Sequence, residues 1–157
     1  MEKLTQIGLQ KADSREIGEK LNELLANYHL YYQNLRGFHW NIKGVHFFQL
    51  HAKFEELYNN ALVKIDEIAE RILTIGQAPL HTFSDYVRVA SIKEAGNLSG
   101  DLETVQATHD NLTAILNLER EILSMASETG DEGTVSLISE DINEIEKTLW
   151  MLNAFLS

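Results

Sequence analysis

The chain has 157 residues, and its 24 acidic and 13 basic side chains give a formal net charge of −11 at pH 7. This charge repels nucleic acid on average and attracts cations, although solubility alone would also account for it. The absence of cysteine excludes a disulfide framework, a thiolate metal site and a thiol nucleophile, and no run of about 18 apolar residues is present to span a bilayer.

The N-terminal stretch MEKLTQIGLQ lacks the apolar core of a signal peptide, so we expect a cytoplasmic protein. The length of the whole chain suits a single domain over residues 1–157. One proline and nine glycines, mostly clustered between periodic apolar stretches, favour a few long helices. Residues 1–12 are weakly periodic and are predicted to form a short, extended or frayed N-terminal arm.

The first long helix is predicted to begin at Asp13, because Asp13 and Glu16 have the spacing of a capping box. At about 100° per residue, His39 falls on the apolar stripe of this helix, so the helix brings an imidazole to its buried face. Gly44 then ends or turns the chain. The stripe consists of Ile17, Leu21, Leu24, Leu25, Tyr28, Tyr32 and Leu35.

The second long helix is predicted from about Val45 to Ile75, and Gly76 and Pro79 stop it. On a helical projection, polar groups interrupt one sector of its apolar face, about 60° wide. We expect these polar groups to be buried, which would require a partner for each of them. The sector contains His51, Glu55, Leu62, Asp66 and Ala69, with Glu70 on its margin.

Residues 80–98 are predicted to be a long connection with a short helix near residues 84–90. A third long helix is predicted from Ser99 or Gly100 to about Ser127, and the turn SETGDEGT leads to a last helix capped at or just before Thr134. Four long helices with a long middle connection predict an all-α four-helix bundle with a crossover between its second and third helices.

Two histidines and three acidic residues supply imidazole and carboxylate, which are the donors that suit iron, manganese or zinc when thiolates are absent. A lone histidine on an apolar face is more often a hydrogen-bonded core residue, and a lone acid is more often solvated. Five such groups together favour a metal site. They are His39, His51, Glu55, Asp66 and Glu70.

Spacing limits the form of this site. His51 and Glu55 are one turn apart, as are Asp66 and Glu70, but His51 and Asp66 are separated by roughly 22 Å along a straight helix. The two pairs are therefore either weak half-sites or are brought together by a second chain, for example in a two-fold dimer with antiparallel second helices. The Glu-x-x-His pairs of a one-chain di-iron bundle are absent, as are a His-Glu-x-x-His zinc motif and a glycine-rich phosphate loop.

Four runs of sequence give the chain a resemblance to the Dps family, the mini-ferritins called DNA-binding proteins from starved cells. They are HWNIKG over residues 39–44, FFQLH over residues 47–51, DEIAER over residues 66–71 and GQAP over residues 76–79. The resemblance covers nearly the whole chain. It implies a ferritin-like bundle that assembles as a hollow homododecamer, oxidises Fe(II), preferably with hydrogen peroxide, and stores ferric mineral to protect the cell from oxidative damage.

The resemblance also implies a role for each candidate ligand. His39, His51 and Glu55 of one subunit, with Asp66 and Glu70 of its two-fold neighbour, would form a two-iron ferroxidase centre in which other divalent metals could substitute. Some relatives have aspartate where this chain has Glu55, and the extra methylene could alter the second iron position.

Aromatic and pore residues are also assigned by the resemblance. Trp40 matches a tryptophan beside the centre, either as an electron donor or as an aromatic wedge at the dimer interface. Asp131 and Glu132 fall near the pores on the three-fold axes and would attract cations, although a solvated turn predicts the same residues. Three further aromatic residues are expected to pack rather than to relay electrons, namely Tyr28, Tyr31 and Tyr32.

DNA binding is the other activity of the family and usually depends on a lysine-rich tail. Residues 1–12 contain only Lys3 and Lys11 as cations, and the chain ends just after its last helix, so we expect weak DNA binding or none. A nucleoid-associated, DNA-compacting scaffold with secondary iron chemistry is the alternative function. A third possibility is a structural helical dimer whose histidines pack without metal.

Overall fold

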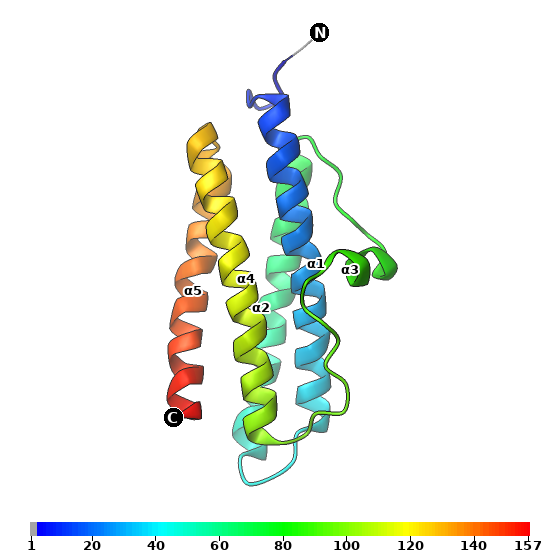
Figure 1. Cartoon of the computed structure of the whole chain (residues 1–157), viewed down its shortest axis with the longest axis vertical. Coiled ribbons are helices and arrows are strands. Elements are labelled where there is room, and N and C mark those ends of the chain that lie inside the picture. Colours follow the sequence, from blue (N-terminus) through cyan, green and yellow to red (C-terminus); the bar gives the residue numbers. More distant parts are fainter. Residues whose placement is uncertain (1–2) are drawn as a thin grey trace.

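Four long helices and one short helix form the part of the chain that the computed structural model describes, residues 3–157. They are α1 (Lys11–Asn41), α2 (Phe47–Thr74), α3 (Phe83–Val89), α4 (Asp101–Thr129) and α5 (Glu132–Leu156). Helices α1 and α2 form one antiparallel hairpin and α4 and α5 a second, and the connection through α3 returns the chain along the bundle (Figure 1). This arrangement confirms the predicted all-α bundle with its short extra helix.

The N-terminal arm differs from the prediction. Helix α1 begins at Lys11, two residues before the predicted cap, and Gln10 in the cap position makes no side-chain capping bond. The preceding residues fold back as a hydrogen-bonded turn in which Thr5 N donates to Leu9 O at 2.8 Å and Leu9 N donates to Thr5 Oγ1 at 3.1 Å. These local bonds satisfy the backbone, so residues 3–10 are not an extended strand. The first two residues of the predicted arm lie outside the described range.

The core lies between the two hairpins and is built from the apolar stripes of all four long helices. Burying these stripes is the main source of stability in a bundle of this kind, because apolar surface leaves water. None of the helices in the described part of the chain has the length and apolar character that a membrane span requires. The most deeply buried large side chains include Leu21, Leu24, Leu35, Phe38, Phe54, Ile68, Ile72, Ile115 and Ile122.

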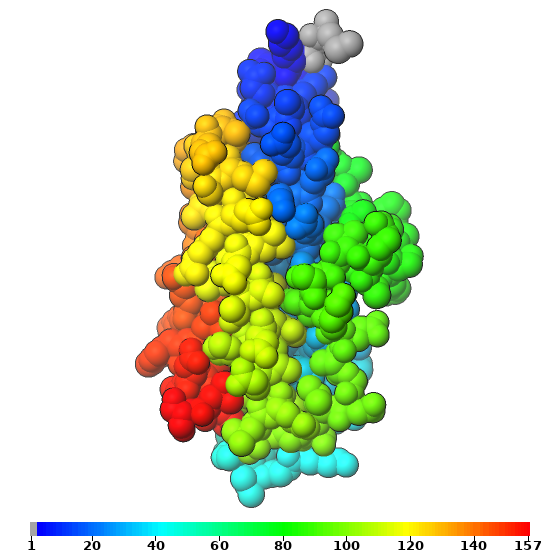
Figure 2. Space-filling view, viewed as in Figure 1, coloured from blue at the N-terminus to red at the C-terminus, as the bar shows by residue number. Residues whose placement is uncertain are grey.

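Asparagines on α1 hold the long connection against the bundle. Asn27 Oδ1 accepts hydrogen bonds from the backbone nitrogens of Ser91 and Ile92, at 3.1 and 2.9 Å. Asn34 binds the next part of the connection through two hydrogen bonds. Its Nδ2 donates to Lys93 O at 3.0 Å, and its Oδ1 accepts from Ala95 N at 2.9 Å. The connection therefore lies along α1, where it forms the green protrusion on one side of the molecule (Figure 2).

A buried polar cluster joins the two hairpins through one side chain from each long helix. Tyr28 of α1 donates to Glu119 Oε1 of α4 at 3.1 Å, and Lys64 Nζ of α2 lies 2.7 Å from Asp141 Oδ1 of α5 as an ion pair. The approach of Lys64 falls outside hydrogen-bond geometry, and neither Glu119 Oε2 nor either Asp141 oxygen has a hydrogen-bond partner within residues 3–157. Burial and the nearby charge of Asp141 raise the pKa of Glu119 to about 9. Burial raises the pKa of Asp141 to about 6, against the opposing effect of Lys64.

The raised pKa of Glu119 predicts a loss of stability as the pH rises. The folded chain keeps the Glu119 proton up to about pH 9, whereas the unfolded chain releases it above the ordinary value of 4.5, so folding becomes less favourable across this interval. Glu119→Gln retains an acceptor for Tyr28 and removes the ionisation. Between pH 5.5 and pH 7.5, wild type should lose stability that the variant keeps. The difference in free energy of unfolding between the two proteins should therefore shift by about 2–3 kcal/mol in favour of the variant.

Chemical denaturation at the two pH values, at matched protein concentration, measures this difference. Glu121→Gln is the matched control, because Glu121 lies two residues away on α4 in a solvent-exposed pair with Lys20 and should show little pH-dependent change. An equal pH response of the two variants would show that Glu119 is not the group that holds the proton.

Candidate metal centre

Two imidazoles form a stacked pair where α1 leads into α2. His39 lies in the last turn of α1 and is buried, and His51 lies near the start of α2 and is half-buried. Their ring centroids are 3.8 Å apart with an interplanar angle of 12°. His39 Nδ1 is 2.6 Å from the backbone oxygen of His51, and His51 Nδ1 is 2.7 Å from the backbone oxygen of His39.

These reciprocal bonds fix the tautomer of both rings. A backbone carbonyl can only accept a hydrogen bond, so each Nδ1 must carry the proton and donate it. In the neutral ring, Nε2 then keeps its lone pair. Histidines that bind metals commonly donate their other ring nitrogen to a carbonyl or carboxylate in this way. The pair therefore presents two Nε2 lone pairs that are already oriented to bind a metal ion.

The hairpin between α1 and α2 sets this geometry. Gly44 has φ +115°, a conformation that favours glycine, and it lets the chain turn between the helices. Phe38 and Phe54 pack together next to the histidines with ring centroids 5.6 Å apart, and Phe47 stacks on His51 at 5.0 Å. The aromatic packing leaves little freedom for His51 to rotate.

The three acidic candidates are exposed in the single chain, contrary to the predicted burial. Glu55, Asp66 and Glu70 all lie on the solvent side of α2 and make no ion pair within residues 3–157. Helix α2 is uninterrupted from Phe47 to Thr74, so the 15 residue steps from His51 to Asp66 span roughly 22 Å. In the described residues, no group of three or more His, Cys, Asp or Glu side chains is placed to hold a metal ion. One chain therefore offers two separate half-sites.

Large apolar side chains share the exposed face of α2 with these carboxylates. Phe48 is 81% exposed, Leu62 51% and Leu73 59%, and at about 100° per residue all three project into the same sector as Glu55 and Asp66. On the neighbouring end of α1, Trp40 is 57% exposed, with the Arg36 guanidinium 4.8 Å from its ring centroid. An apolar surface of this kind around polar groups is typical of a protein–protein interface.

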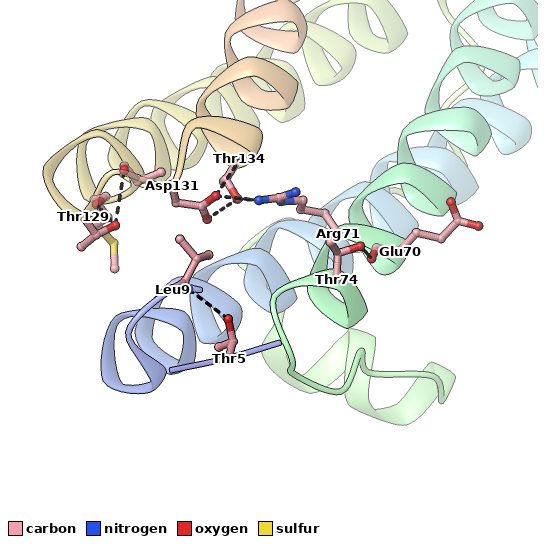
Figure 3. A network of polar contacts seen from close by, with 10 residues as sticks. Thr5, Leu9, Glu70, Arg71, Thr74, Thr129, Asp131 and Thr134 are labelled. Atoms are coloured by element: carbon pink, nitrogen blue, oxygen red, sulfur yellow. Dashed lines mark hydrogen bonds and ion pairs between the residues drawn. The ribbon is translucent and has the colours of Figure 1, made fainter. Parts of the chain in front are cut away.

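Asp131 is placed differently from the predicted pore residue. It is only 2% exposed, and its Oδ1 accepts from Arg71 Nη2 of α2 at 2.6 Å (Figure 3). Its carboxylate also caps α5, because Thr134 N donates to Oδ1 at 3.2 Å and Thr134 Oγ1 donates to Oδ2 at 2.6 Å. Both oxygens are thus engaged within the chain. The structure favours a capping role for Asp131 and leaves Glu132, which is exposed, as the residue available to solvent.

Two neighbouring residues of α2 point in different directions (Figure 3). Arg71 points toward the start of α5, and Glu70 points away from it. Arg71 approaches the backbone closely, since a Cβ added to Gly133 would lie 2.6 Å from its guanidinium nitrogens. A side chain at position 133 would therefore have to displace the guanidinium from this position. Arg71 and Glu70 thus lie on different sides of α2.

Tyr58 lies near the imidazoles and is not among the residues predicted from the sequence. The ring of Tyr58 lies 5.4 Å from that of His39, at 78°. The signal was available, because Tyr58 is two helical turns after His51 and so lies on the same side of α2. The reciprocal hydrogen bonds between His39 and His51 could not be predicted from sequence spacing, because they depend on how α1 and α2 pack together.

Comparison with known proteins identifies close relatives. The sequence matches the Ferritin family, described as a ferritin-like domain, over residues 18–157. It is 42% identical over 156 residues to the DNA protection during starvation protein of Porphyromonas gingivalis, which covers 99% of this chain and 98% of that relative.

Solved structures show the same similarity. A Dps protein from Vibrio cholerae O1, described as a member of a broad superfamily of ferritin-like diiron-carboxylate proteins, has a TM-score of 0.98 and 48% identity over 100% of this chain and 99% of that chain. A Dps protein from Bacillus brevis has a TM-score of 0.90 and 36% identity over 93% of this chain and 98% of that chain.

The burial of Asp131 predicts a large effect on stability from its removal. Asp131→Ala leaves Arg71 without its partner and α5 without its cap, and should lower the free energy of unfolding by about 3 kcal/mol. Glu132→Ala removes the adjacent exposed acid and should cost less than about 1 kcal/mol. Chemical denaturation at matched protein concentration measures both. If Asp131→Ala unfolded like wild type, the capping role would be wrong.

Proposed function

Because the chain belongs to the Dps family of ferritin-like proteins, we propose that it oxidises Fe(II) at a centre shared by two copies and stores the ferric product. The oxidant is preferably hydrogen peroxide, and the assembly is a hollow homododecamer in the cytoplasm. One observation supports the shared centre above all others. His51 and the carboxylates of Asp66 and Glu70 lie at separate points on one unbroken helix, α2, and the side of α2 that carries them also exposes large apolar side chains.

A two-fold dimer with antiparallel α2 helices would complete two centres at once. The start of α2 in one copy would then face the later turns of α2 in the other, so that His39, His51 and Glu55 meet the partner's Asp66 and Glu70. The exposed side chains of Trp40 and Leu62 would be covered by the same contact. The proposal therefore accounts for the apolar face and for the separated ligands together.

The donors fit iron as a substrate. Two neutral imidazole nitrogens and three carboxylates suit a first-row metal, and they bind Fe(II) weakly enough to release the product. The carboxylates make no ion pair within residues 3–157, so they favour the more highly charged ferric ion. Two Fe(II) ions at one centre can give peroxide both of the electrons that it needs, which avoids release of hydroxyl radical.

DNA binding is a weaker expectation for this chain, although relatives are named DNA protection proteins. Phosphate contacts from lysine and arginine dominate such binding. Here twelve copies would each carry a net charge of −11. We therefore assign protection to the removal of Fe(II) and peroxide, rather than to a compacting scaffold.

Mixing two inactive variants tests the shared centre. His51→Ala and Asp66→Ala should each lose rapid Fe(II) oxidation by at least about tenfold in stopped-flow absorbance after anaerobic loading and addition of peroxide. Co-assembled chains should recover part of the rate, because each hybrid dimer regains one complete centre of its two.

Glu56→Gln is the matched control for this experiment. Glu56 is a neighbouring acid of α2 that pairs with Lys53 and lies outside the ligand sector, so its variant should oxidise iron like wild type. No recovery in hybrids verified by mass spectrometry would count against a centre made by two chains.

A gel-shift assay tests the expectation for DNA. At physiological salt and with magnesium chelated, the assembled protein should leave a linear duplex unshifted at micromolar concentration, since about −11 charges per chain oppose phosphate contact. A Dps protein with a lysine-rich tail provides the positive control. A salt-sensitive shift without divalent cations would revive the DNA-compacting alternative.

A further inference from the structure

An unbroken line of aromatic contacts leads away from His39. The Tyr58 ring meets the His39 ring with centroids 5.4 Å apart at 78°, and the Tyr32 ring meets the Tyr58 ring at 5.9 Å and 89°. Beyond Tyr32, the Arg36 guanidinium lies 5.3 Å from the Tyr32 centroid and 4.8 Å from that of Trp40. The contacts are edge-to-face, which is a favourable packing geometry in itself, so contact alone does not separate packing from electron transfer.

The hydroxyl groups separate the two roles. One-electron oxidation of tyrosine releases the phenolic proton, so a donor tyrosine needs a hydroxyl that can lose it to water or a base. Tyr28 and Tyr86 donate their hydroxyls to Glu119 and to Leu80 O. Tyr31 is fully buried, and burial raises its pKa far above the ordinary range. These three tyrosines hold their protons firmly.

Tyr58 and Tyr32 differ from the other three tyrosines of the chain. Both are half-buried, and neither hydroxyl makes a hydrogen bond to another group within residues 3–157. They are also the two tyrosines in line with His39. Neither phenol is therefore held by an acceptor within the described residues.

The charge of Arg36 makes Trp40 a less favourable electron donor than Tyr58. Oxidised tryptophan is initially a cation, and a guanidinium 4.8 Å from the Trp40 centroid opposes that charge. Tyr58 is not covered by Arg36, and loss of its proton leaves a neutral radical. The first electron is thus more easily drawn from Tyr58 than from Trp40, although Trp40 is next to His39 in the sequence.

We propose that Tyr58 supplies one electron to peroxide when a centre holds a single Fe(II). This inference rests on the proposed ferroxidase function and names a further electron donor for it. One Fe(II) gives one electron and becomes Fe(III), and one tyrosine gives the second electron and its phenolic proton. Together with two protons, one of them from the tyrosine, the two electrons reduce one hydrogen peroxide to two waters. The product on the chain is a neutral tyrosyl radical.

Electron paramagnetic resonance after rapid freezing tests the proposal. The protein is loaded anaerobically with one Fe(II) per centre, mixed with hydrogen peroxide and frozen. Wild type should show an organic radical whose hyperfine pattern changes when the protein contains ring-deuterated tyrosine. Tyr58→Phe keeps the ring in place but lacks the phenol, and it should reduce the tyrosyl signal by roughly tenfold.

Hydroxyl radical release gives a second readout. With one Fe(II) per centre, Tyr58→Phe should form more spin-trapped hydroxyl radical than wild type, because the second electron is missing. With two Fe(II) per centre, its rate of iron oxidation should stay within about twofold of wild type, since the metals supply both electrons. Tyr31→Phe is the matched control, as Tyr31 is a buried tyrosine of α1 outside the line, and it should match wild type in both readouts.

The outcomes are distinguishable. Normal iron oxidation with an undiminished tyrosyl signal in Tyr58→Phe, or an equal loss in Tyr31→Phe, would overturn the role of Tyr58 and leave the proposed function standing. A wild-type protein that oxidises no Fe(II) under any loading would refute the proposed function, and the electron donor with it.

Discussion

The length of an unbroken α2 is the constraint on which the rest of the structure depends. Buried side chains such as Phe54, Ile68 and Ile72 line one side of α2 along most of its length. The helix is uninterrupted from Phe47 to Thr74, so no kink brings its two ends together. His51 near its start and Asp66 near its end therefore cannot approach within one chain. The opposite side of the same helix carries the candidate ligands and the exposed apolar groups. The straight, packed helix is thus the reason why the proposed centre needs a second copy.

The two half-sites differ in how firmly they are held. The imidazoles of His39 and His51 are oriented by each other's backbone carbonyls, so their positions follow from the α1–α2 hairpin. Within residues 3–157, Asp66 and Glu70 have no partner side chain, and they are exposed to solvent, where they keep their rotamer freedom. A shared centre would therefore combine a preorganised nitrogen half with an oxygen half that adjusts to the metal. Such a division suits an ion that changes its charge during turnover, because carboxylates can shift as Fe(II) becomes Fe(III).

The sequence predicted features that depend on local spacing and did not predict those that depend on how helices meet. Periodicity predicted α2 from about Val45 to Ile75, and the helix spans Phe47–Thr74. The predicted position of His39 on the inner side of α1 is confirmed. Asp131 has the sequence context of an exposed turn, and only the approach of Arg71, 60 residues away, shows it to be buried. The exposure of the α2 carboxylates was also misjudged, because periodicity marks a face but does not say whether the same chain covers it.

Two sets of acidic groups in this bundle have opposite electrostatic states, and the contrast explains where a cation can bind. Inside the bundle, Lys64 pairs with Asp141, and Glu119 keeps its proton because burial raises its pKa. That cluster has little remaining charge with which to attract a metal. On the outer face, Asp66 and Glu70 are exposed and make no ion pair within residues 3–157, so their charge is free to act. Two copies that meet there bring like charges together, and this repulsion opposes an empty interface. Burial of the exposed apolar side chains offsets it, and a bound cation would relieve it where the ligands converge.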